Sequence, residues 1–437
     1  MPDIPIASNT ARPDAARGSL RSLDDALAEL LSYAHPPLGS ETIPTFDADG
    51  RVLAADAVSA LHVPSHDNSA MDGYAMRASD VPSGGTVLRV SQRIPAGSNG
   101  TALEAGTAAR IFTGAPLPPG ADAVVMQEET TSLDDGARVR FNAVPGAGQN
   151  VRRAGEDVTR GAPVVLQGDR LTPAACGLVA SIGMATLDVS RRPRVALFST
   201  GDELVMPGSV APEAMRPGAI YNSNRFFLRA LLARLGCEVT DLGIVPDRLD
   251  DTVTALRDAA GAHDLVLTSG GVSVGEEDHV RAAVQSLGQL QLWQLAIKPG
   301  KPFAYGKLAR PGATGRADNA QHAESCHFIG LPGNPVSSFV TFLVLVRPFL
   351  LKLQGATRLI PEPMPLPAHF NLPRADRRRE FLRVRRNAEG GLDLFPNQSS
   401  GVLTSVVWGD GLLDNAAGRT IAWGDSVPFI SFTDLLS

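Results

Sequence analysis

The sequence predicts a multidomain α/β protein with three kinds of domain. They are a doubly wound, mostly parallel α/β domain, a β-rich N-terminal unit with helical segments, and a small C-terminal β-barrel. Residues 194–353 alternate between strand-type and helix-type patterns, and residues 51–159 carry short β-type runs separated by turns. A proline-rich stretch at 355–367 precedes a last segment of short strands. At roughly 150 residues per domain, the 437 residues also suggest about three domains.

Composition and charge exclude several classes of protein. Hydrophobic residues make up 43% of the chain and charged residues 20%. This balance supplies enough apolar area for hydrophobic cores and excludes a largely disordered protein. The net charge of −6 gives no general attraction to nucleic acid or anionic lipid, so any bound anion needs a local site. The longest apolar stretch, 339–353, contains Arg347 and Pro348 and falls short of the ~18 uninterrupted residues of a membrane span. We therefore expect no membrane and no nucleic acid as partners.

The N-terminus and the cysteines favour a cytoplasmic protein. Residues 1–18 are polar and without periodicity, which predicts a disordered tail, and no secretory signal pattern is visible there. Cys176, Cys237 and Cys326 are far apart, odd in number and without Cys-x-x-Cys spacing. This pattern argues against a disulfide framework and against a structural zinc site.

The predicted elements follow in order along the chain. A helix begins after Ser22, which is a suitable N-cap followed by acids and regularly spaced leucines. Residues 19–55 and 152–190 are predicted to form one N-terminal domain around an inserted β-rich domain at 56–151. The α/β domain is placed at 191–353 and the C-terminal barrel at 358–437.

The α/β domain shows the clearest pattern. Its predicted strands and helices alternate, as in an open parallel sheet with helices on both faces. A polar insertion at 310–325 separates the last two strands. The expected strands are 194–199, 238–244, 264–268, 292–297, 302–308 and 327–329, and the expected helices are 222–235, 250–260, 278–287 and 335–353.

Polar, glycine-bearing loops follow five of these strands. In an open parallel sheet, ligands bind outside the carboxyl ends of the strands, so we expect the loops to meet at one edge. The loops are 199–203, 245–247, 269–278, 298–302 and 330–338. The sequence therefore predicts a ligand site at this edge of the sheet.

The third of these loops suits an oxyanion. Ser269, Gly270 and Gly271 let successive backbone N–H groups approach an anion, and the hydroxyls of Ser269 and Ser273 add donors. An ordinary strand-to-helix turn is the alternative for a single Gly-Gly pair. The charged neighbouring loops favour the anion site.

Acids and lysines occur in the other loops. Glu203, Asp247 and Asp278 lie at or near three strand ends, and Mg²⁺ is usually held by one or two protein carboxylates together with substrate phosphates. The alternative for Asp278 is complementing a helix dipole. Lys298 and Lys301 surround a Pro-Gly corner and would offset phosphate charge; a solvated loop is the alternative for them.

A helix N-terminus follows the last strand. Pro332 and Gly333 shape the turn that exposes it, and Asn334 and Pro335 are its N-cap and first-turn proline. Together with Ser337 in the first turn, they complete the candidate substrate-binding set.

Two other patterns have weaker interpretations. The Gly-x-Ser-x-Gly sequence around Ser273 matches a serine-hydrolase elbow, but no downstream histidine is marked by a motif, so a hydrolase is a minor alternative. The arginine-rich run 374–386 lacks interleaved aromatics, which favours a solvated strand face over a nucleic-acid patch.

Six motifs, taken in order, resemble those of MoeA-type molybdopterin molybdenumtransferases, the family that includes the E domain of gephyrin. The resemblance runs from about residue 22 to the C-terminus and leaves out the tail and the 310–325 insertion. The motifs are 67–75, 113–116, 199–204, 269–275, 298–302 and 331–337.

The resemblance implies a Mg²⁺-dependent reaction in which molybdate attacks adenylylated molybdopterin, releasing AMP and leaving molybdenum on the dithiolene. It also implies an elongated homodimer whose N-terminal linker domain serves in dimerisation. The site would lie between the α/β domain of one subunit and the N-terminal β unit of the other, with Glu203 and Asp278 as metal ligands. By motif, Asp67 and Thr113 would reach across the dimer, and Glu203, Asp247, Asp278 and Lys298 would line the α/β pocket.

Some details and alternatives remain open at the level of sequence. The resemblance also implies Asp157 as a site residue, as a weaker candidate than the others. Gln294 stands where some relatives have a second lysine. A molybdopterin adenylyltransferase and apo-molybdoenzymes or their chaperones are implied as partners. The alternative functions are molybdopterin adenylyltransferase, whose glycine loop typically reads Thr-Gly-Gly-Thr-Gly, and a non-enzymatic scaffold.

Overall fold

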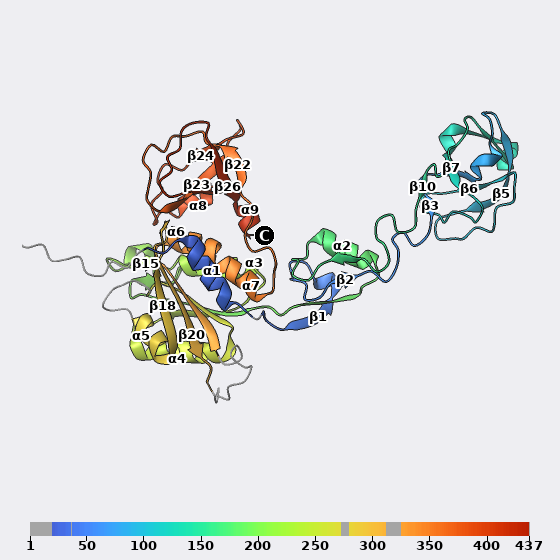
Figure 1. Ribbon diagram of the computed structural model, residues 1–437. Coiled ribbons are helices and arrows are strands. Elements are labelled where there is room, and N and C mark those ends of the chain that lie inside the picture. The colour runs from blue at the N-terminus through green and yellow to red at the C-terminus, as the bar shows by residue number, and fades with distance from the viewer. Residues whose placement is uncertain (1–19, 36, 272–278, 312–324, 437) are drawn as a thin grey trace, which may run out of the picture. The chain divides into compact units, whose positions relative to one another are not determined.

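The computed structural model in Figure 1 describes residues 20–35, 37–271, 279–311 and 325–436. The predicted tail at 1–18, Ser273, Asp278 and most of the 310–325 insertion lie outside the described residues. By its contacts the chain divides into two compact units. The first contains Met1–Glu41 and Ser190–Ser437, and the second contains Thr42–Val189.

A twisted sheet with the strand order β16-β13-β17-β21-β20-β18 forms the centre of the first unit. The first four strands are parallel to one another, and β20 runs antiparallel to both of its neighbours. The mostly parallel α/β prediction is confirmed. Because β18 runs in the same direction as β21, its carboxyl end lies at the same edge of the sheet. The strands are β13 (Arg194–Thr200), β16 (Glu238–Val245), β17 (Leu265–Ser269), β18 (Gly288–Gln294), β20 (Pro302–Ala309) and β21 (Ser325–Leu331).

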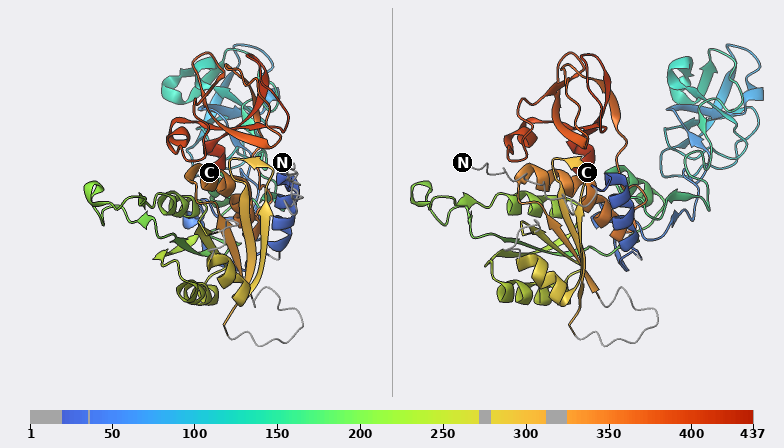
Figure 2. Two further views of the ribbon diagram at one scale, coloured as in Figure 1. Left: turned by 90° about the vertical axis from the view of Figure 1, so that its left-hand side faces the viewer. Right: turned by 60° about the vertical axis from the view of Figure 1, so that its left-hand side comes forward.

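Helices cover both faces of this sheet (Figure 2). On one face, α4 (Leu249–Ala262) and α5 (His279–Leu287) bury a core that includes the fully buried Phe198, Val266 and Phe328. On the other face lie α1 (Leu23–Tyr33) and α7 (Arg347–Leu353), where Tyr33 stacks on Tyr305 with ring centroids 4.5 Å apart. The alternating buried side chains of the strands therefore support two layers of helix. A further helix, α3 (Asn224–Arg234), packs along β13 and β16.

A long apolar helix follows β21. It consists of α6 (Pro335–Thr341), a π-helical turn (Phe342–Val346) and α7. Pro335–Leu353 has the length and hydropathy of a membrane span, and 89% of its most apolar window is buried inside the protein. A core helix of a soluble protein has the same properties.

The first helix belongs to the first unit. The Ser22 hydroxyl accepts the Asp25 N–H at 3.1 Å, which confirms the predicted N-cap. In the structure α1 contacts α7. Its last residue, Tyr33, stacks on Tyr305 of the sheet. The grouping of this helix with residues 152–190 in one domain remains a prediction.

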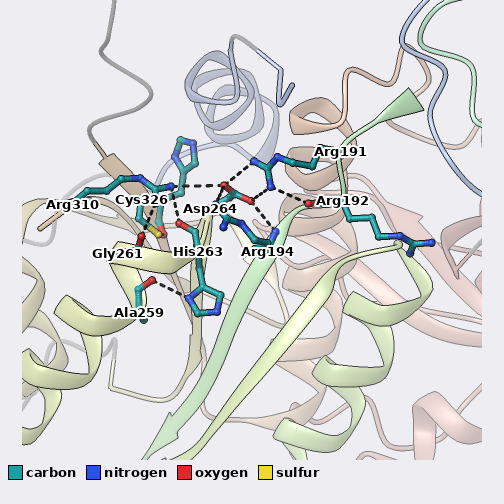
Figure 3. A network of polar contacts seen from close by, with 10 residues as sticks. Arg191, Arg192, Arg194, Ala259, Gly261, His263, Asp264, Arg310 and Cys326 are labelled. Carbon is teal, nitrogen blue, oxygen red and sulfur yellow. Dashed lines mark hydrogen bonds and ion pairs between the residues drawn. The ribbon is translucent and has the colours of Figure 1, made fainter. Parts of the chain in front are cut away.

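A network of hydrogen bonds and ion pairs around Asp264 lies at the amino-terminal edge of the parallel strands (Figure 3). Asp264 directly precedes β17 and accepts two hydrogen bonds of 3.1 Å from the Arg191 guanidinium and one of 2.8 Å from the Arg194 N–H. Arg310 lies 3.7 Å from the same carboxylate. Burial alone would raise the pKa of Asp264, but these hydrogen bonds outweigh it and hold the pKa below its usual range.

The second unit contains a sheet with the order β7-β4-β6-β5-β9-β8, as expected for a β-rich unit. Tyr74 and Met76 face one core with Phe141, whereas Ala75 between them faces another with Ile94, so both faces of the sheet are covered. Its strands are β4 (Gly73–Met76), β5 (Val87–Ile94), β6 (Thr107–Ile111), β7 (Ala123–Met126), β8 (Thr130–Leu133) and β9 (Arg138–Phe141).

Segments before and after this sheet pair with each other. The pairs are β1 (Ser40–Pro44) with β12 (Thr186–Ser190), β2 (Ala57–Val58) with β11 (Pro163–Val165), and β3 (Asn68–Ser69) with β10 (Val151–Arg152). The helix α2 (Pro173–Ser181) supplies Val179 to a core that also contains Leu53 and Val158. This shared core is compatible with an inserted domain; its boundaries at 56 and 151 remain predictions.

The C-terminal β domain is built on a sheet with the order β19-β23-β25-β26-β22. Leu382, Val384 and Phe429 belong to its core. One edge strand, β19 (Ile297–Lys298), comes from the loop after β18, so the α/β domain and the C-terminal domain share a sheet. The other strands are β22 (Met364–Pro367), β23 (Arg379–Arg386), β24 (Leu392–Leu394) beside β23, β25 (Gly411–Asn415) and β26 (Ser426–Ser431).

Candidate functional site

A cavity of about 1010 Å³ lies at the carboxyl ends of the strands in the first unit. All five loops that follow these strands contribute to its walls, as the strand pattern predicts. The C-terminal β domain adds Arg378 and the segment 398–401. The cavity therefore lies where ligands bind in open α/β sheets, beside β13 and β17, where the strand order reverses.

Most predicted site residues of the first unit line this cavity. They are Glu203, Asp247, Ser269, Gly270, Gly271, Lys298, Lys301, Pro332, Gly333, Asn334 and Ser337. Ser273 and Asp278 lie outside the described residues. The structure brings the lining residues together, and their individual roles remain predictions.

The glycine turn after β17 requires glycine for steric reasons. Gly270 and Gly271 have φ values of +95° and +65°. A Cβ on Gly271 would lie 2.5 Å from Val280 Cγ2 and 2.9 Å from Thr200 Oγ1. The turn can therefore run close to the end of β13 and to α5 only without side chains, which leaves backbone at the cavity wall.

The Ser269 hydroxyl has partners within the protein. Its Oγ accepts a 2.8 Å hydrogen bond from Asn224 Nδ2 and donates to the Pro332 carbonyl at 3.2 Å. Asn224 Nδ2 also donates to the Gly333 carbonyl at 2.7 Å. The predicted ligand donor thus holds two loops of the cavity together. No motif in the sequence marks Asn224, which the start of helix α3 brings to this point.

Lys298 is paired with carboxylates of the C-terminal domain. Its Nζ donates to Glu380 Oε1 at 2.9 Å and lies 3.3 Å from Asp376 Oδ2. The hydrogen bond to Glu380 is the main cause that raises the pKa of Lys298 above its ordinary value. Lys301, in contrast, is exposed and has no ion pair among the residues that the structure describes. The two lysines of this loop therefore have different environments.

The arginine-rich run 374–386 is more than a solvated strand face, which corrects the sequence interpretation. Arg378 lines the cavity. Arg383 is only 1% exposed and donates to the Phe381 carbonyl at 2.9 Å. Alternation along β23 places successive side chains on opposite faces, so part of the run points inward. Gln398 and the serines 399–400 also line the cavity and carry no sequence signal that marks them.

Two acids of the described chain lie on the cavity wall. They are Glu203 and Asp247. A Cβ on Gly201 would lie 2.6 Å from Glu203 Oε2, so the carboxylate folds back over this glycine. Within the described ranges, no cluster of three or more His, Cys, Asp or Glu side chains is arranged to hold a metal ion. Two carboxylates suit Mg²⁺, which takes its remaining oxygen ligands from phosphates and water.

The two motifs of the second unit lie beside each other. Gly114 donates its N–H to the Ser69 carbonyl at 2.8 Å, and Asn68 forms a bridge with Pro116. Asp67 accepts hydrogen bonds from the Ala154 N–H and the Arg153 guanidinium, and both lower its pKa, the Ala154 bond most.

Thr113 is oriented by a neighbouring acid. Its N–H and its Oγ1 each donate to Asp72 Oδ1 at 2.8 Å. Asp67 and Thr113 are therefore brought to one region of the second unit. Asp157 lies exposed on the same unit.

The fold and the cavity define an α/β protein with a strand-end site suited to an anionic, phosphate-bearing ligand. Three family models match the chain in order: the MoeA N-terminal region (domains I and II) at 21–183, a probable molybdopterin-binding domain at 196–352, and the MoeA C-terminal region (domain IV) at 365–432. The chain belongs to the MoeA family.

Relatives and solved structures agree with this assignment. A protein of Haemophilus influenzae named molybdopterin molybdenumtransferase is 42% identical over 368 residues, 83% of this chain and 85% of that protein. A protein of Synechococcus elongatus with the same name is 36% identical over 86% of this chain and 91% of its own length. The crystal structure of a molybdopterin biosynthesis MoeA protein from Pyrococcus horikoshii matches with a TM-score of 0.80 at 27% identity, covering 95% of this chain and all of that one.

Proposed function

We propose that this protein is a molybdopterin molybdenumtransferase of molybdenum cofactor biosynthesis. It transfers molybdenum from molybdate to adenylylated molybdopterin and releases AMP. The observation that carries the proposal is the single cavity in which the glycine turn, the acids and the lysines of the family motifs meet. Relatives that are 42% and 36% identical to this chain bear the name of this activity.

The residues of the cavity can bind two anions. Backbone at Gly270 and Gly271 approaches a phosphate or another tetrahedral oxyanion without side chains in the way. Lys298, Lys301 and Arg378 line the same space and offset the charge of the adenylate and of molybdate. Donors already fixed before the reaction stabilise the charge of the departing phosphate, and no covalent protein nucleophile is required.

The carboxylates provide the hard oxygen ligands that Mg²⁺ prefers. Glu203 and Asp278 are the proposed ligands, and Asp247 lies on the same cavity as Glu203. When bound, Mg²⁺ would neutralise phosphate charge on the adenylate.

The proposed active form is a cytoplasmic homodimer. Asp67 and Thr113, with Asp157 as a weaker candidate, would complete the cavity of the partner subunit. An adenylyltransferase would supply the substrate, and apo-molybdoenzymes or their chaperones would receive the product. Sedimentation at micromolar concentration tests the dimer, and a monomer with full activity would contradict the shared site.

A crystal soaked with AMP and molybdate tests the proposed site. We expect density for both in the cavity between the 269–271 turn and the 298–301 loop. The variant Gly271→Val should lose both, because its side chain would fill the turn. Density only outside the cavity would contradict the proposal.

A further inference from the structure

We propose that Asp376 and Glu380 of the C-terminal β domain are positioning residues that fix the two cations Lys298 and Arg378 on the cavity wall. The C-terminal domain would then set the electrostatics of a site built mostly by the α/β domain. The effect on turnover rests on the proposed function. The contacts from which the positioning role is argued are independent of that function.

Backbone pairing brings the lysine to the carboxylate. β19 and β23 are parallel neighbours, with Ile297 opposite Arg379 and Lys298 opposite Glu380. The Arg379 N–H also donates to the Ala296 carbonyl at 2.9 Å. The loop that carries Lys298 is thus an edge strand of the C-terminal sheet, so the backbone of one domain holds the cation of the other.

Glu380 is a buried carboxylate with fixed partners. It is 4% exposed, and its Oε1 accepts a hydrogen bond of 2.9 Å from the Lys298 ammonium. Its Oε2 lies 3.4 Å from Nδ2 of Asn415, which also donates to the Arg419 carbonyl at 3.1 Å. Since a buried charge is costly without a partner, the pairing with Glu380 favours the charged ammonium form of Lys298 and raises its pKa.

Asp376 is shared between two cations. Its Oδ2 lies 3.3 Å from Lys298 Nζ, and its two oxygens accept Nε and Nη2 of Arg378 at 3.2 Å each. The Arg378 N–H donates to Oδ1 at 3.0 Å. The hydrogen bonds from Arg378 hold the pKa of Asp376 well below its usual range. One carboxylate therefore determines how far apart the two cations lie.

This arrangement leaves donors available for a ligand. An ammonium has three N–H donors and Lys298 uses two of them on the carboxylates, so one remains for an oxygen in the cavity. Arg378 uses one side of its guanidinium and keeps Nη1. Among the described residues, the other charged groups on the cavity are Glu203, Asp247 and Lys301.

The test compares Glu380→Gln and Asp376→Asn with a matched control, Asp414→Asn. Asp414 lies in the same sheet and pairs with Arg379 instead of Lys298. The readout is the rate at which acetic anhydride labels Lys298 across a pH series in the full-length protein without substrate, measured by peptide mass spectrometry. Lys301 in the same loop is the internal reference.

Only the neutral amine reacts, so loss of a carboxylate that favours the ammonium should speed the labelling of Lys298 relative to Lys301. A fall of one pKa unit corresponds to about a tenfold faster rate at pH values below the pKa. We expect a several-fold increase for Glu380→Gln, a smaller one for Asp376→Asn, and no change for Asp414→Asn. Equal labelling ratios in the wild type and both carboxamide variants would overturn the inference. Should Glu380→Gln fail to fold, the more exposed Asp376→Asn alone decides.

Activity gives a second, separable readout. In an AMP-release assay, Glu380→Gln should lower kcat and shift the alkaline limb of the pH profile to lower pH, and Glu380→Asp should restore part of the rate. If labelling changes as expected but the wild type releases no AMP, the proposed function fails and the positioning role stands. If the wild type is active and labelling does not respond, the positioning role fails alone.

Discussion

Asn224 Nδ2 lies 2.8 Å from Ser269 Oγ, and this buried contact joins the start of α3 to the end of β17. The same amide reaches the Gly333 carbonyl, so the glycine turn and the Pro-Gly turn are tied before any ligand binds. A site that is fixed in advance does not have to reorganise when charge develops during the reaction. The stability of the fold and the shape of the cavity are therefore linked at this contact.

Replacing Ser269 by alanine should destabilise the protein. The change removes a buried hydroxyl and leaves an Asn224 donor without its acceptor, which costs about 1–3 kcal/mol. Urea denaturation measures the loss. Ser286→Ala is the control, because within the described part of the chain that hydroxyl bonds to a carbonyl of its own helix at 2.8 Å. Equal midpoints for the two variants would contradict the assigned role of the hydroxyl.

The strand-end loops could be predicted from sequence, because parallel strands place their carboxyl ends at one edge. Arg378 and the 398–401 segment could not, because they reach the cavity through the β19–β23 pairing of distant segments. The Asn224 contact escaped prediction because it joins side chains that lie 45 residues apart in the sequence.

One strand boundary was also wrong, for a local reason. The sequence pattern treats Gly288 as a helix stop and begins the strand at 292, whereas β18 spans Gly288–Gln294. A Cβ on Gly288 would lie 2.0 Å from the Lys307 carbonyl oxygen. Close strand pairing requires glycine at this position. A rule that treats glycine as the end of a helix cannot tell that the same residue also begins a strand.

Glu203→Gln should weaken the dependence of turnover on Mg²⁺. The carboxamide keeps the size of the side chain and removes the charge that a hard cation prefers, so we expect a loss of roughly 10²-fold or more, about 3 kcal/mol. AMP release at varied Mg²⁺ measures it. Glu213→Gln, an exposed acid outside the cavity, is the control. An unchanged Mg²⁺ dependence in Glu203→Gln would remove Glu203 from the metal site.

Asp264→Asn should destabilise the protein in a pH-dependent way. Because the folded-state pKa is depressed, the contribution of the carboxylate is present above its unfolded pKa of about 3.9 and is lost as pH falls through the folded pKa. We expect a cost of roughly 2–3 kcal/mol at neutral pH, below that of a fully buried pair because Arg191 is 35% exposed. Urea denaturation at several pH values should show the gap between wild type and variant closing below about pH 4. Asp258→Asn on α4 is the control, and a gap that widens in acid would contradict the ion-pair account.

Ser273 should not act as a nucleophile. An acyl-transfer serine needs a histidine base within hydrogen-bond reach, and no histidine is among the described residues that line the cavity. Ser273→Ala should cost at most about 1–3 kcal/mol, roughly ten- to hundredfold in rate. Measuring the intact mass after treatment with a fluorophosphonate distinguishes a nucleophilic serine from one that only donates a hydrogen bond. Stoichiometric labelling at Ser273 would favour a hydrolase.

The most direct test of molybdenum transfer is the stoichiometry of one reaction. Purified protein is incubated with adenylylated molybdopterin, molybdate and Mg²⁺, and both AMP and molybdenum-loaded pterin are quantified. The account predicts equal amounts of the two products, with AMP release that depends on molybdate and is lost in Lys298→Ala. AMP release that is independent of molybdate, or accumulation of adenylylated pterin from ATP, would contradict it.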